Sequence, residues 1–224
     1  MQSKKKHIII YSHGFGVRKD DNGLLSDIAD AFPEIESVLF DYNDVDEING
    51  TLTVYPFSTQ VKRLQEVLAE TRSKNPEAVI DLIGHSQGTL IAALARLKGI
   101  RKIIFLAPPF KMDIERSLER YRTRPGNVID LEGTSRLPGT GGFIRIVPKE
   151  YWTERIAVKP FEEYNKLAEH NEIIAITAKQ DNRLLPVDLK NLNPKIKIIS
   201  VDGDHDFSGD AREFLIKEIR KIIN

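Results

Sequence analysis

Cysteine is absent from this chain of 224 residues. Its absence excludes a disulfide framework, a thiolate zinc site and a cysteine nucleophile. An excess of charge of one sign is also lacking, because 33 Lys and Arg residues balance 33 Asp and Glu residues. A balanced chain does not have the overall basic character of a nucleic-acid binder, so we expect no nucleic-acid partner, although a local basic patch remains compatible with this balance.

Long apolar runs are missing as well. No stretch approaches the roughly 18 consecutive apolar residues that a membrane-spanning helix needs. The basic N-terminus is followed only by Ile8–Tyr11 before Ser12, which is too short for the apolar region of a signal peptide. We therefore expect a cytoplasmic protein without a membrane partner. Residues 1–224 fit one domain with one sizeable insertion better than two domains.

The chain does contain six short apolar, β-branched runs separated by amphipathic segments. The runs are His7–Ser12, Ser37–Tyr42, Ala78–Ile83, Lys102–Ala107, Glu172–Ala178 and Lys195–Val201. Several are apolar almost throughout, which is typical of parallel strands covered on both faces by helices. The alternation predicts an α/β fold with a doubly wound, mostly parallel, six-stranded sheet.

Helical periodicity marks the segments between these runs. A helix over Leu24–Phe32 should stop at Pro33, and Ser58 can cap the next one. Thr89–Lys98 is apolar nearly all round and predicts a central helix closed by Gly99. A last helix, over residues 210–223, should turn four side chains inward: Phe214, Leu215, Ile219 and Ile222.

Residues 110–158 interrupt the alternation. A charged segment, residues 111–124, could be helical, and Val128–Leu131 could pair with Phe143–Val147 as a hairpin across a Gly- and Pro-rich stretch. An insertion after the fourth strand, at its carboxyl end, would cover the crevice where such sheets bind ligands. We interpret residues 110–158 as a small cap; the alternative is a surface excursion without a role.

Four arginines gather at the start of this insertion, and acidic residues interleave with them. The arginines are Arg116, Arg120, Arg122 and Arg124; the acids are Asp113, Glu115 and Glu119. Mixed charge of this kind favours a solvated helix face over an anion site.

Gly84–Gly88 follows the third run directly and opens the apolar helix. A G-x-S-x-G pattern between a strand and a helix predicts a nucleophile elbow that exposes the Ser86 hydroxyl at a helix N-terminus. Glycine at 84 and 88 removes β-carbons that would collide with the neighbouring strand or helix. The alternative is a buried serine in an ordinary turn. We expect His85, within the turn, to serve packing only.

A serine nucleophile needs a base and a group that orients the base. His205 lies in a polar loop at the carboxyl end of the last run, whereas His7 begins a strand, His85 sits in the elbow and His170 ends a helix. Asp181, after the fifth run, is the expected partner of His205, with Asp113 as the substitute. The order Ser, Asp, His along the chain is the order expected of α/β-hydrolases.

Two backbone N–H groups should form the oxyanion hole. One belongs to Gln87, directly after Ser86, and the other to Phe15 in the loop His13–Gly16 after the first run. If the first strand lies between the second and the third, this loop borders the crevice at the point where strand order reverses. The alternative is a simple glycine turn.

Together, His13–Gly16, Gly84–Gly88, Asp181 and His205 resemble the α/β-hydrolase superfamily over nearly the whole chain. The elbow and the short insertion resemble bacterial short-capped esterases of the cinnamoyl (feruloyl) type. The resemblance implies a carboxylic-ester hydrolase with Ser86 as nucleophile and a small lid over an acyl pocket. Three features depart from that group. We expect the leading antiparallel strands to be absent, Thr89 replaces a glycine, and Asn43–Glu47 replaces a Gly- and Ser-containing loop.

The expected partner is a small-molecule ester, and no cofactor or metal is implied, since the histidines are scattered and no H-E-x-x-H occurs. Phe143, Tyr151 and Trp152 could wall the acyl pocket or form the cap core. A thioesterase, a lactonase or a monoacylglycerol lipase would use the same residues. An amidase or peptidase, for which no acidic amine-binding pair is evident, and a non-catalytic binding module fit less well. The pattern specifies no oligomeric state.

Overall fold

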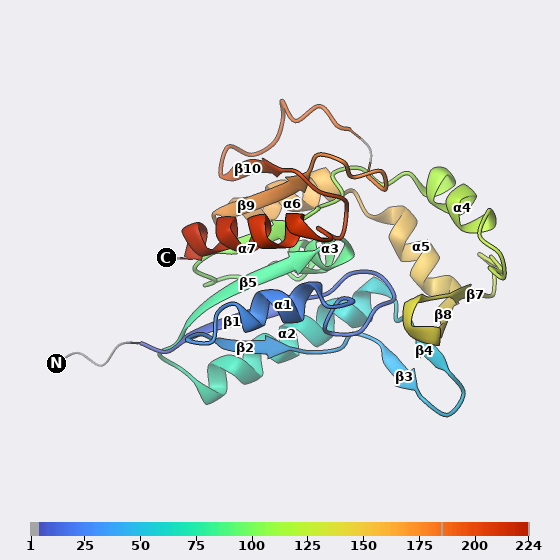
Figure 1. Cartoon of the computed structure of the whole chain (residues 1–224), viewed down its shortest axis with the longest axis horizontal. Coiled ribbons are helices and arrows are strands. Elements are labelled where there is room, and N and C mark those ends of the chain that lie inside the picture. Colours follow the sequence, from blue (N-terminus) through green and yellow to red (C-terminus); the bar gives the residue numbers. More distant parts are fainter. Residues whose placement is uncertain (1–4, 185, 224) are drawn as a thin grey trace.

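The structure is a computed structural model that describes residues 5–184 and 186–223. Its main sheet contains six parallel strands in the order β10-β9-β6-β5-β1-β2 (Figure 1). The strands are β1 (His7–Ser12), β2 (Glu36–Leu39), β5 (Val79–His85), β6 (Ile103–Leu106), β9 (Ile173–Ala178) and β10 (Ile196–Val201). The predicted six-stranded, doubly wound sheet is confirmed, and β2 lies outside β1 as expected.

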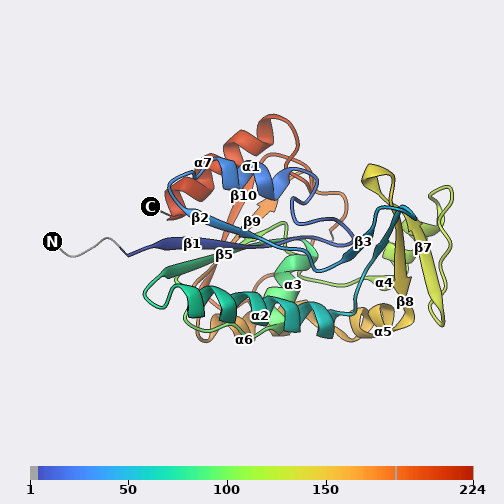
Figure 2. The ribbon, with the colours of Figure 1, turned by 90° about the horizontal axis from the view of Figure 1, so that it is seen from below.

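Helices cover both faces of this sheet (Figure 2). One layer contains α1 (Leu24–Asp30) and α7 (Asp210–Ile223); the other contains α2 (Phe57–Lys74), α3 (Gln87–Leu94) and α6 (Pro160–Ala168). Strand side chains alternate between two cores, so Ile9 packs with the first layer and Ile10 with the second. Both are completely buried, which is why the strand sequence is apolar without alternation. No helix in the described ranges is long and apolar enough to cross a bilayer.

A second, smaller sheet lies beyond the carboxyl ends of the main strands (Figures 1 and 2). Its strands, in spatial order, are β3 (Asp44–Asp46), β4 (Thr51–Thr53), β8 (Ile144–Pro148) and β7 (Thr134–Pro138). The parallel pairing of β4 with β8 joins two segments far apart in the chain. Helices α4 (Ile114–Arg122) and α5 (Lys149–Ala157) belong to the same end of the molecule, and the 3-10 turn η1 (Thr140–Gly142) links β7 to β8.

The hairpin within residues 110–158 differs from the prediction in its first strand. Strand β8 pairs with β7, whereas Val128 makes only an isolated bridge with Arg136. The Asp130 carboxylate accepts hydrogen bonds from the backbone N–H groups of Glu132 and Gly133, so the chain turns there. That turn breaks the expected strand Val128–Leu131.

Three predicted helix details are wrong. The helix expected over Thr89–Lys98 and closed by Gly99 ends at Leu94, because the chain leaves the helical conformation at Arg96, whose φ is 49°.

Helix α2 begins at Phe57 without a side-chain cap, because the backbone N–H and hydroxyl of Ser58 both donate to Glu154 of α5. Phe214 is 58% exposed, whereas Leu215 of the same helix is completely buried. One residue turns an α-helix by about 100°, so the stripe that buries Leu215 leaves Phe214 toward solvent.

Helix α3 packs closely on β1 at Gly88. A β-carbon built on Gly88 would lie 2.1 Å from the backbone oxygen of Ser12, in β1. We therefore predict that Gly88→Ala lowers the free energy of unfolding by about 3 kcal/mol or more, since backbone cannot yield as a side chain does. Urea denaturation measures this change.

Gly133→Ala is the matched control, because its β-carbon would meet only the carboxylate of Asp130, an exposed side chain that can rotate. We expect a loss within about 1 kcal/mol for that variant. A Gly88→Ala protein as stable as the wild type would contradict the close packing of α3 on β1.

Candidate active site

Ser86 occupies the turn between β5 and α3. Its backbone has φ 50° and ψ −119°, a conformation that residues other than glycine rarely adopt. Thr89, which stands where the resembled family has glycine, fastens this turn: its hydroxyl lies 2.6 Å from the Ser86 carbonyl oxygen and 2.7 Å from the Tyr164 hydroxyl. The strained strand–turn–helix geometry holds the Ser86 hydroxyl at the N-terminus of α3.

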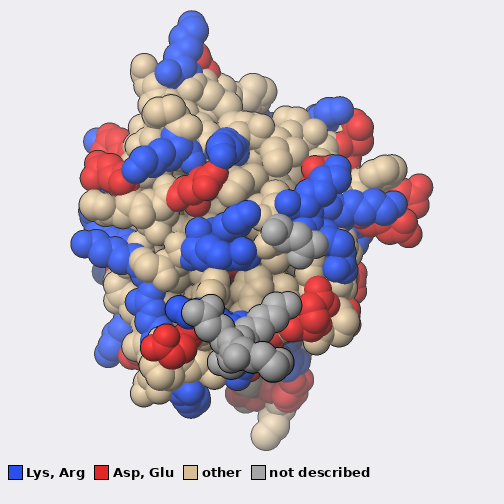
Figure 3. Space-filling model, turned by 90° about the vertical axis from the view of Figure 1, so that its left-hand side faces the viewer, with Lys and Arg blue, Asp and Glu red and all other residues tan. Residues whose placement is uncertain are grey.

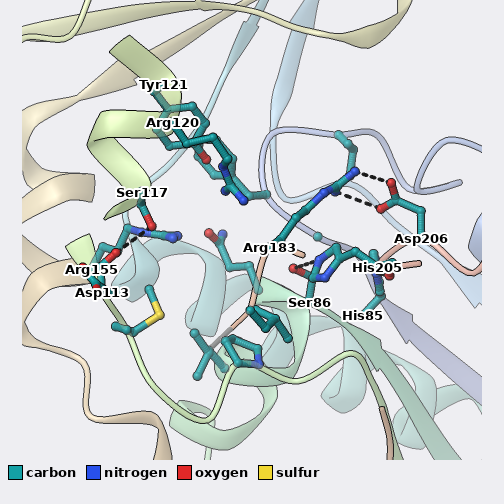
Figure 4. Close-up of a pocket in the computed structure, with 18 of the residues that line it drawn as sticks. His85, Ser86, Asp113, Ser117, Arg120, Tyr121, Arg155, Arg183, His205 and Asp206 are labelled. Carbon is teal, nitrogen blue, oxygen red and sulfur yellow. Dashed lines mark hydrogen bonds and ion pairs between the residues drawn. The ribbon is translucent and has the colours of Figure 1, made fainter. Parts of the chain in front are cut away.

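The three residues expected to form a triad lie in contact. His205 Nε2 is 2.9 Å from Ser86 Oγ (Figure 4). His205 Nδ1 is 2.6 Å from Asp181 Oδ2. They come from the turn after β5, the loop after β9 and the loop after β10. Asp113, the substitute carboxylate, lies instead at the start of α4, where it accepts the Arg116 backbone N–H at 2.9 Å.

The surroundings of this pair set its protonation. Burial alone would raise the pKa of Asp181, but the hydrogen bond from His205 and the backbone N–H groups of Arg183 and Leu184 lower it. Burial of the ring lowers the pKa of His205, and the nearby His85 lowers it further, while Asp181 acts in the opposite direction. Asp181 is therefore ionised and His205 neutral at neutral pH, so Nε2 is free to accept a proton from Ser86.

A second His–Asp pair lies directly behind the first. His85 Nδ1 is 2.8 Å from Asp21 Oδ2, and His85 Nε2 is 3.1 Å from the backbone oxygen of His205. Both ring nitrogens face acceptors, and only an imidazolium has two N–H groups to donate. Burial alone would lower the pKa of His85, but the Asp21 carboxylate raises it, in agreement with the charged form.

This pair also fixes the loop after β1, because Asp21 Oδ2 accepts the backbone N–H of Gly14 at 2.7 Å. Asp21 was missed by the sequence analysis, and His85 does more than the packing expected of it. Asp21 is only 5% exposed. Its burial cannot be predicted from sequence periodicity, because it lies in a loop of charged and polar residues. The one available signal was the histidine inside the elbow, whose two ring nitrogens need partners when buried.

The loop after β1 is shaped by a buried histidine. The His13 ring accepts the backbone N–H of Tyr42 at Nε2 (3.0 Å), and its Nδ1 lies 2.9 Å from the Gly14 carbonyl oxygen, to which it donates. Burial lowers the pKa of His13, which suits this neutral form. Phe15 of this loop and Gln87 of α3 lie beside Ser86 in one cavity. Within the described residues, neither backbone N–H donates to another protein atom.

Ser86 and His205 open into a cavity of about 210 Å³. Side chains from the loops of the main sheet form one wall, and α4, β8 and α5 form the other (Figure 4). Basic side chains dominate this wall. Six arginines line the cavity: Arg116, Arg120, Arg124, Arg145, Arg155 and Arg183.

The interpretation of the four arginines as a solvated face holds for Arg116, Arg122 and Arg124, which are exposed, whereas Arg120 is half-buried. Of the four, Arg122 lies outside the cavity wall. Arg116, Arg120 and Arg124 are spaced by four residues, so they share one face of the segment, and that face borders the cavity. Charge composition hid this arrangement, but the four-residue spacing could have revealed it.

Phe143, Tyr151 and Trp152, which could wall the acyl pocket or form the cap core, do not line the cavity at Ser86 within the described residues. Tyr151 and Trp152 are almost completely buried. The Tyr151 hydroxyl donates to Gln87 Oε1 at 2.5 Å, and Trp152 Nε1 donates to Ser135 Oγ at 3.0 Å. Phe143 lines a separate hollow beside Gly139. The packing alternative therefore fits Tyr151 and Trp152, because their polar atoms find partners inside the core.

One group of side chains has the spacing of a metal site. Ligand atoms of His85, His205 and Asp206 all lie within 4.8 Å of one another. Each is already engaged, however: His85 with Asp21, His205 with Asp181 and Ser86, and Asp206 with Arg183. A protonated His85 has no lone pair for a metal, so this group does not fit a metal ion.

Comparisons with known proteins rest on structure. No family model matches the sequence, and no curated protein matches it. Among solved structures, Est1E from Butyrivibrio proteoclasticus with bound ferulic acid aligns with a TM-score of 0.72 at 16% identity, over 99% of this chain and 90% of that one. The α/β hydrolase GrgF from Penicillium sp. sh18 aligns with a TM-score of 0.68 at 19% identity, over 97% and 89%.

The Pyrococcus furiosus esterase Pf2001 aligns with a TM-score of 0.69 at 13% identity, over 97% of this chain and 80% of that one. At such low sequence identity, structural similarity shows a shared fold only. The resemblance seen in the sequence is confirmed at that level, and the chain has the α/β-hydrolase fold.

Proposed function

We propose that the protein is a serine hydrolase that cleaves small carboxylic esters through an acyl-enzyme intermediate. One observation carries the proposal: Ser86 Oγ lies 2.9 Å from His205 Nε2, and His205 Nδ1 lies 2.6 Å from Asp181. These distances suit a nucleophile, a general base and the group that orients the base. The esterases among the structural neighbours support the same reaction class.

In the first half of the reaction, His205 accepts the Ser86 proton while Ser86 Oγ bonds to the ester carbonyl carbon. The carbonyl oxygen becomes an oxyanion, which the backbone N–H groups of Phe15 and Gln87 stabilise. His205, now charged and held by Asp181, gives its proton to the leaving alcohol as the carbon–oxygen bond breaks. In the second half, a water molecule loses a proton to His205 and releases the acid from Ser86. No cofactor takes part.

Residues 110–158 act as the cap of this site in the proposal. Their contribution to the cavity supports this role, because Tyr121 of α4, Arg145 of β8 and Arg155 of α5 all border it. If residues 110–158 were instead a surface excursion without a role, the cavity would keep its wall without them.

Replacing the nucleophile tests the proposal directly. Ser86→Ala should lower kcat by about three orders of magnitude or more, since the acyl-enzyme cannot form. Hydrolysis of 4-nitrophenyl acetate and butyrate measures this loss, and labelling of Ser86 by a fluorophosphonate separates an enzyme from a binding module. Ser117→Ala is the control, because Ser117 borders the same cavity but only donates to the Asp113 carbonyl oxygen. Full hydrolysis by Ser86→Ala would contradict the assignment.

The identity of the orienting carboxylate gives a second prediction. Asp181→Asn should lower kcat by about three to four orders of magnitude, because an amide favours the wrong tautomer of His205. Asp113→Asn should leave kcat close to that of the wild type, because that carboxylate contacts the α4 backbone rather than His205. Steady-state kinetics of the two variants decide between them, and the reverse ranking would show that Asp113 is the partner.

The pH dependence follows from the pKa of His205, which burial of the ring lowers and the charge of His85 lowers further. Because the pKa of His205 is lowered, kcat/KM should rise with pH through a midpoint below the ordinary histidine value of about 6.5. His85→Gln removes a positive charge near His205, so the pKa of His205 rises and the midpoint moves to higher pH. A pH–rate profile from pH 4 to 9 measures both midpoints, and an unmoved midpoint in His85→Gln would contradict a charged His85.

A further inference from the structure

Five of the six cavity arginines have no acidic partner within the described residues, and three of these five are not exposed. Arg120, Arg145 and Arg155, called here the arginine cluster, come from α4, β8 and α5. Guanidinium groups remain charged at neutral pH, and buried charges are ordinarily paired. Within the described residues, none of the three lies within 4.0 Å of an Asp or Glu oxygen, whereas Arg183 beside them pairs with Asp206.

The contacts of the arginine cluster fix its side chains without neutralising them. Arg145 Nε donates to the Gly16 carbonyl oxygen at 2.6 Å, and an Arg155 nitrogen donates to the Tyr151 hydroxyl at 2.9 Å. Both guanidinium carbons lie over the Phe15 ring, at 5.8 and 5.9 Å from its centre. Arg145 and Arg155 are therefore held around Phe15, the residue proposed to supply one oxyanion N–H, while Arg120 lies over the Tyr121 ring.

Donors of the cluster remain unused. The Nε atoms of Arg120 and Arg155 are buried and have no hydrogen-bond partner within the described residues. Arg145 is only 9% exposed, and its burial lowers the pKa of its guanidinium, as expected for a charge that loses water without gaining an anion. In Figure 4, Arg120 and Arg155 reach into the cavity from the side opposite Ser86 and His205.

The acids that border the cavity are occupied elsewhere. Asp21 pairs with His85, Asp206 pairs with Arg183, and Asp113 accepts a backbone N–H of α4. The cavity thus has an excess of positive charge that no described side chain offsets.

The opposite end of the molecule shows the ordinary arrangement. At the amino ends of the main strands, basic and acidic side chains are interspersed (Figure 3). Lys6 pairs there with Glu36, and Arg101 with Asp81. The unpaired arginines at the cavity are therefore a local feature in a chain whose formal net charge is zero.

We propose that the natural substrate is an ester carrying a separate anionic group, a carboxylate or a phosphate, which the arginine cluster binds. This inference rests on the proposed function, because it names the substrate class of the same site. Planar guanidinium groups bind both kinds of anion through paired hydrogen bonds. The cavity of about 210 Å³ suits a small charged ester and not a long acyl chain.

Matched ester pairs test the proposal on the complete chain. In the acyl arm, the 4-nitrophenyl monoester of glutarate is compared with 4-nitrophenyl pentanoate. In the alcohol arm, 3-acetoxybenzoate and 3-acetoxyphenyl phosphate are each compared with the neutral 3-acetoxybenzamide. Rates are corrected for spontaneous hydrolysis. We expect kcat/KM to favour the anionic ester by about tenfold to a hundredfold in at least one arm, the range for hydrogen bonds to a charged group.

The arm that responds identifies whether the acyl or the alcohol side of the ester carries the charge. Within the alcohol arm, the benzoate and the phenyl phosphate separate carboxylate from phosphate. Arg120→Gln and Arg155→Gln should each lower the anionic-to-neutral ratio of kcat/KM by about tenfold or more. Arg122→Gln is the matched control, because Arg122 lies on the same helix but faces solvent. It should keep the wild-type ratio.

Equal kcat/KM for anionic and neutral esters, with hydrolysis still dependent on Ser86, would overturn this inference and leave the proposed function intact. A preference that survives in both Arg120→Gln and Arg155→Gln, with circular dichroism showing folded proteins, would also overturn it. Absence of Ser86-dependent hydrolysis for every ester would overturn the proposed function together with the inference.

Discussion

The buried ion pair of His85 and Asp21 connects three loops that come from distant parts of the chain. Through Asp21 it holds the Gly14 backbone, through His85 it belongs to the turn of Ser86, and through a ring nitrogen it reaches the His205 carbonyl oxygen. Burying two charges costs free energy that their attraction repays only when further hydrogen bonds complete the site. Here those bonds are to backbone atoms, so the geometry of the cavity floor depends on one internal charge pair.

Much of the main sheet follows from local sequence rules. The runs around Ile8–Ile10 and Ile103–Leu106 are apolar because helices cover both faces of the sheet, and burial on both faces leaves a simple pattern. Because parallel strands end at one edge, the loops that follow them meet there, which made Ser86, Asp181 and His205 predictable neighbours from their positions after three different strands. Sheet topology alone was enough to predict that these three residues are neighbours.

The remaining features depend on tertiary contacts that leave weak traces in sequence. Strands β3 and β4 have three residues each, too few for an alternating pattern, and they exist because β8 pairs with β4. The aromatic pair Tyr151 and Trp152 could not be assigned to core or pocket, since both environments favour large rings. The direction of the α4 arginines was hidden for a similar reason: mixed charge indicates solvent unless the element facing the helix is known.

The small sheet has a consequence for how this molecule can be altered. One half of it, β3–β4, precedes the elbow in the chain, and the other half, β7–β8, follows it by about fifty residues, yet Thr51 to Thr53 and Ile144 to Ile146 form one ladder. Excising residues 110–158 would remove β8 and leave β3 and β4 as an isolated two-stranded hairpin, which is only marginally stable in water. The unpaired N–H and C=O groups of β4 would then be exposed to pairing with other chains. The two segments must therefore be shortened, exchanged or grafted as a unit, because each supplies the hydrogen-bond partners that keep the other folded.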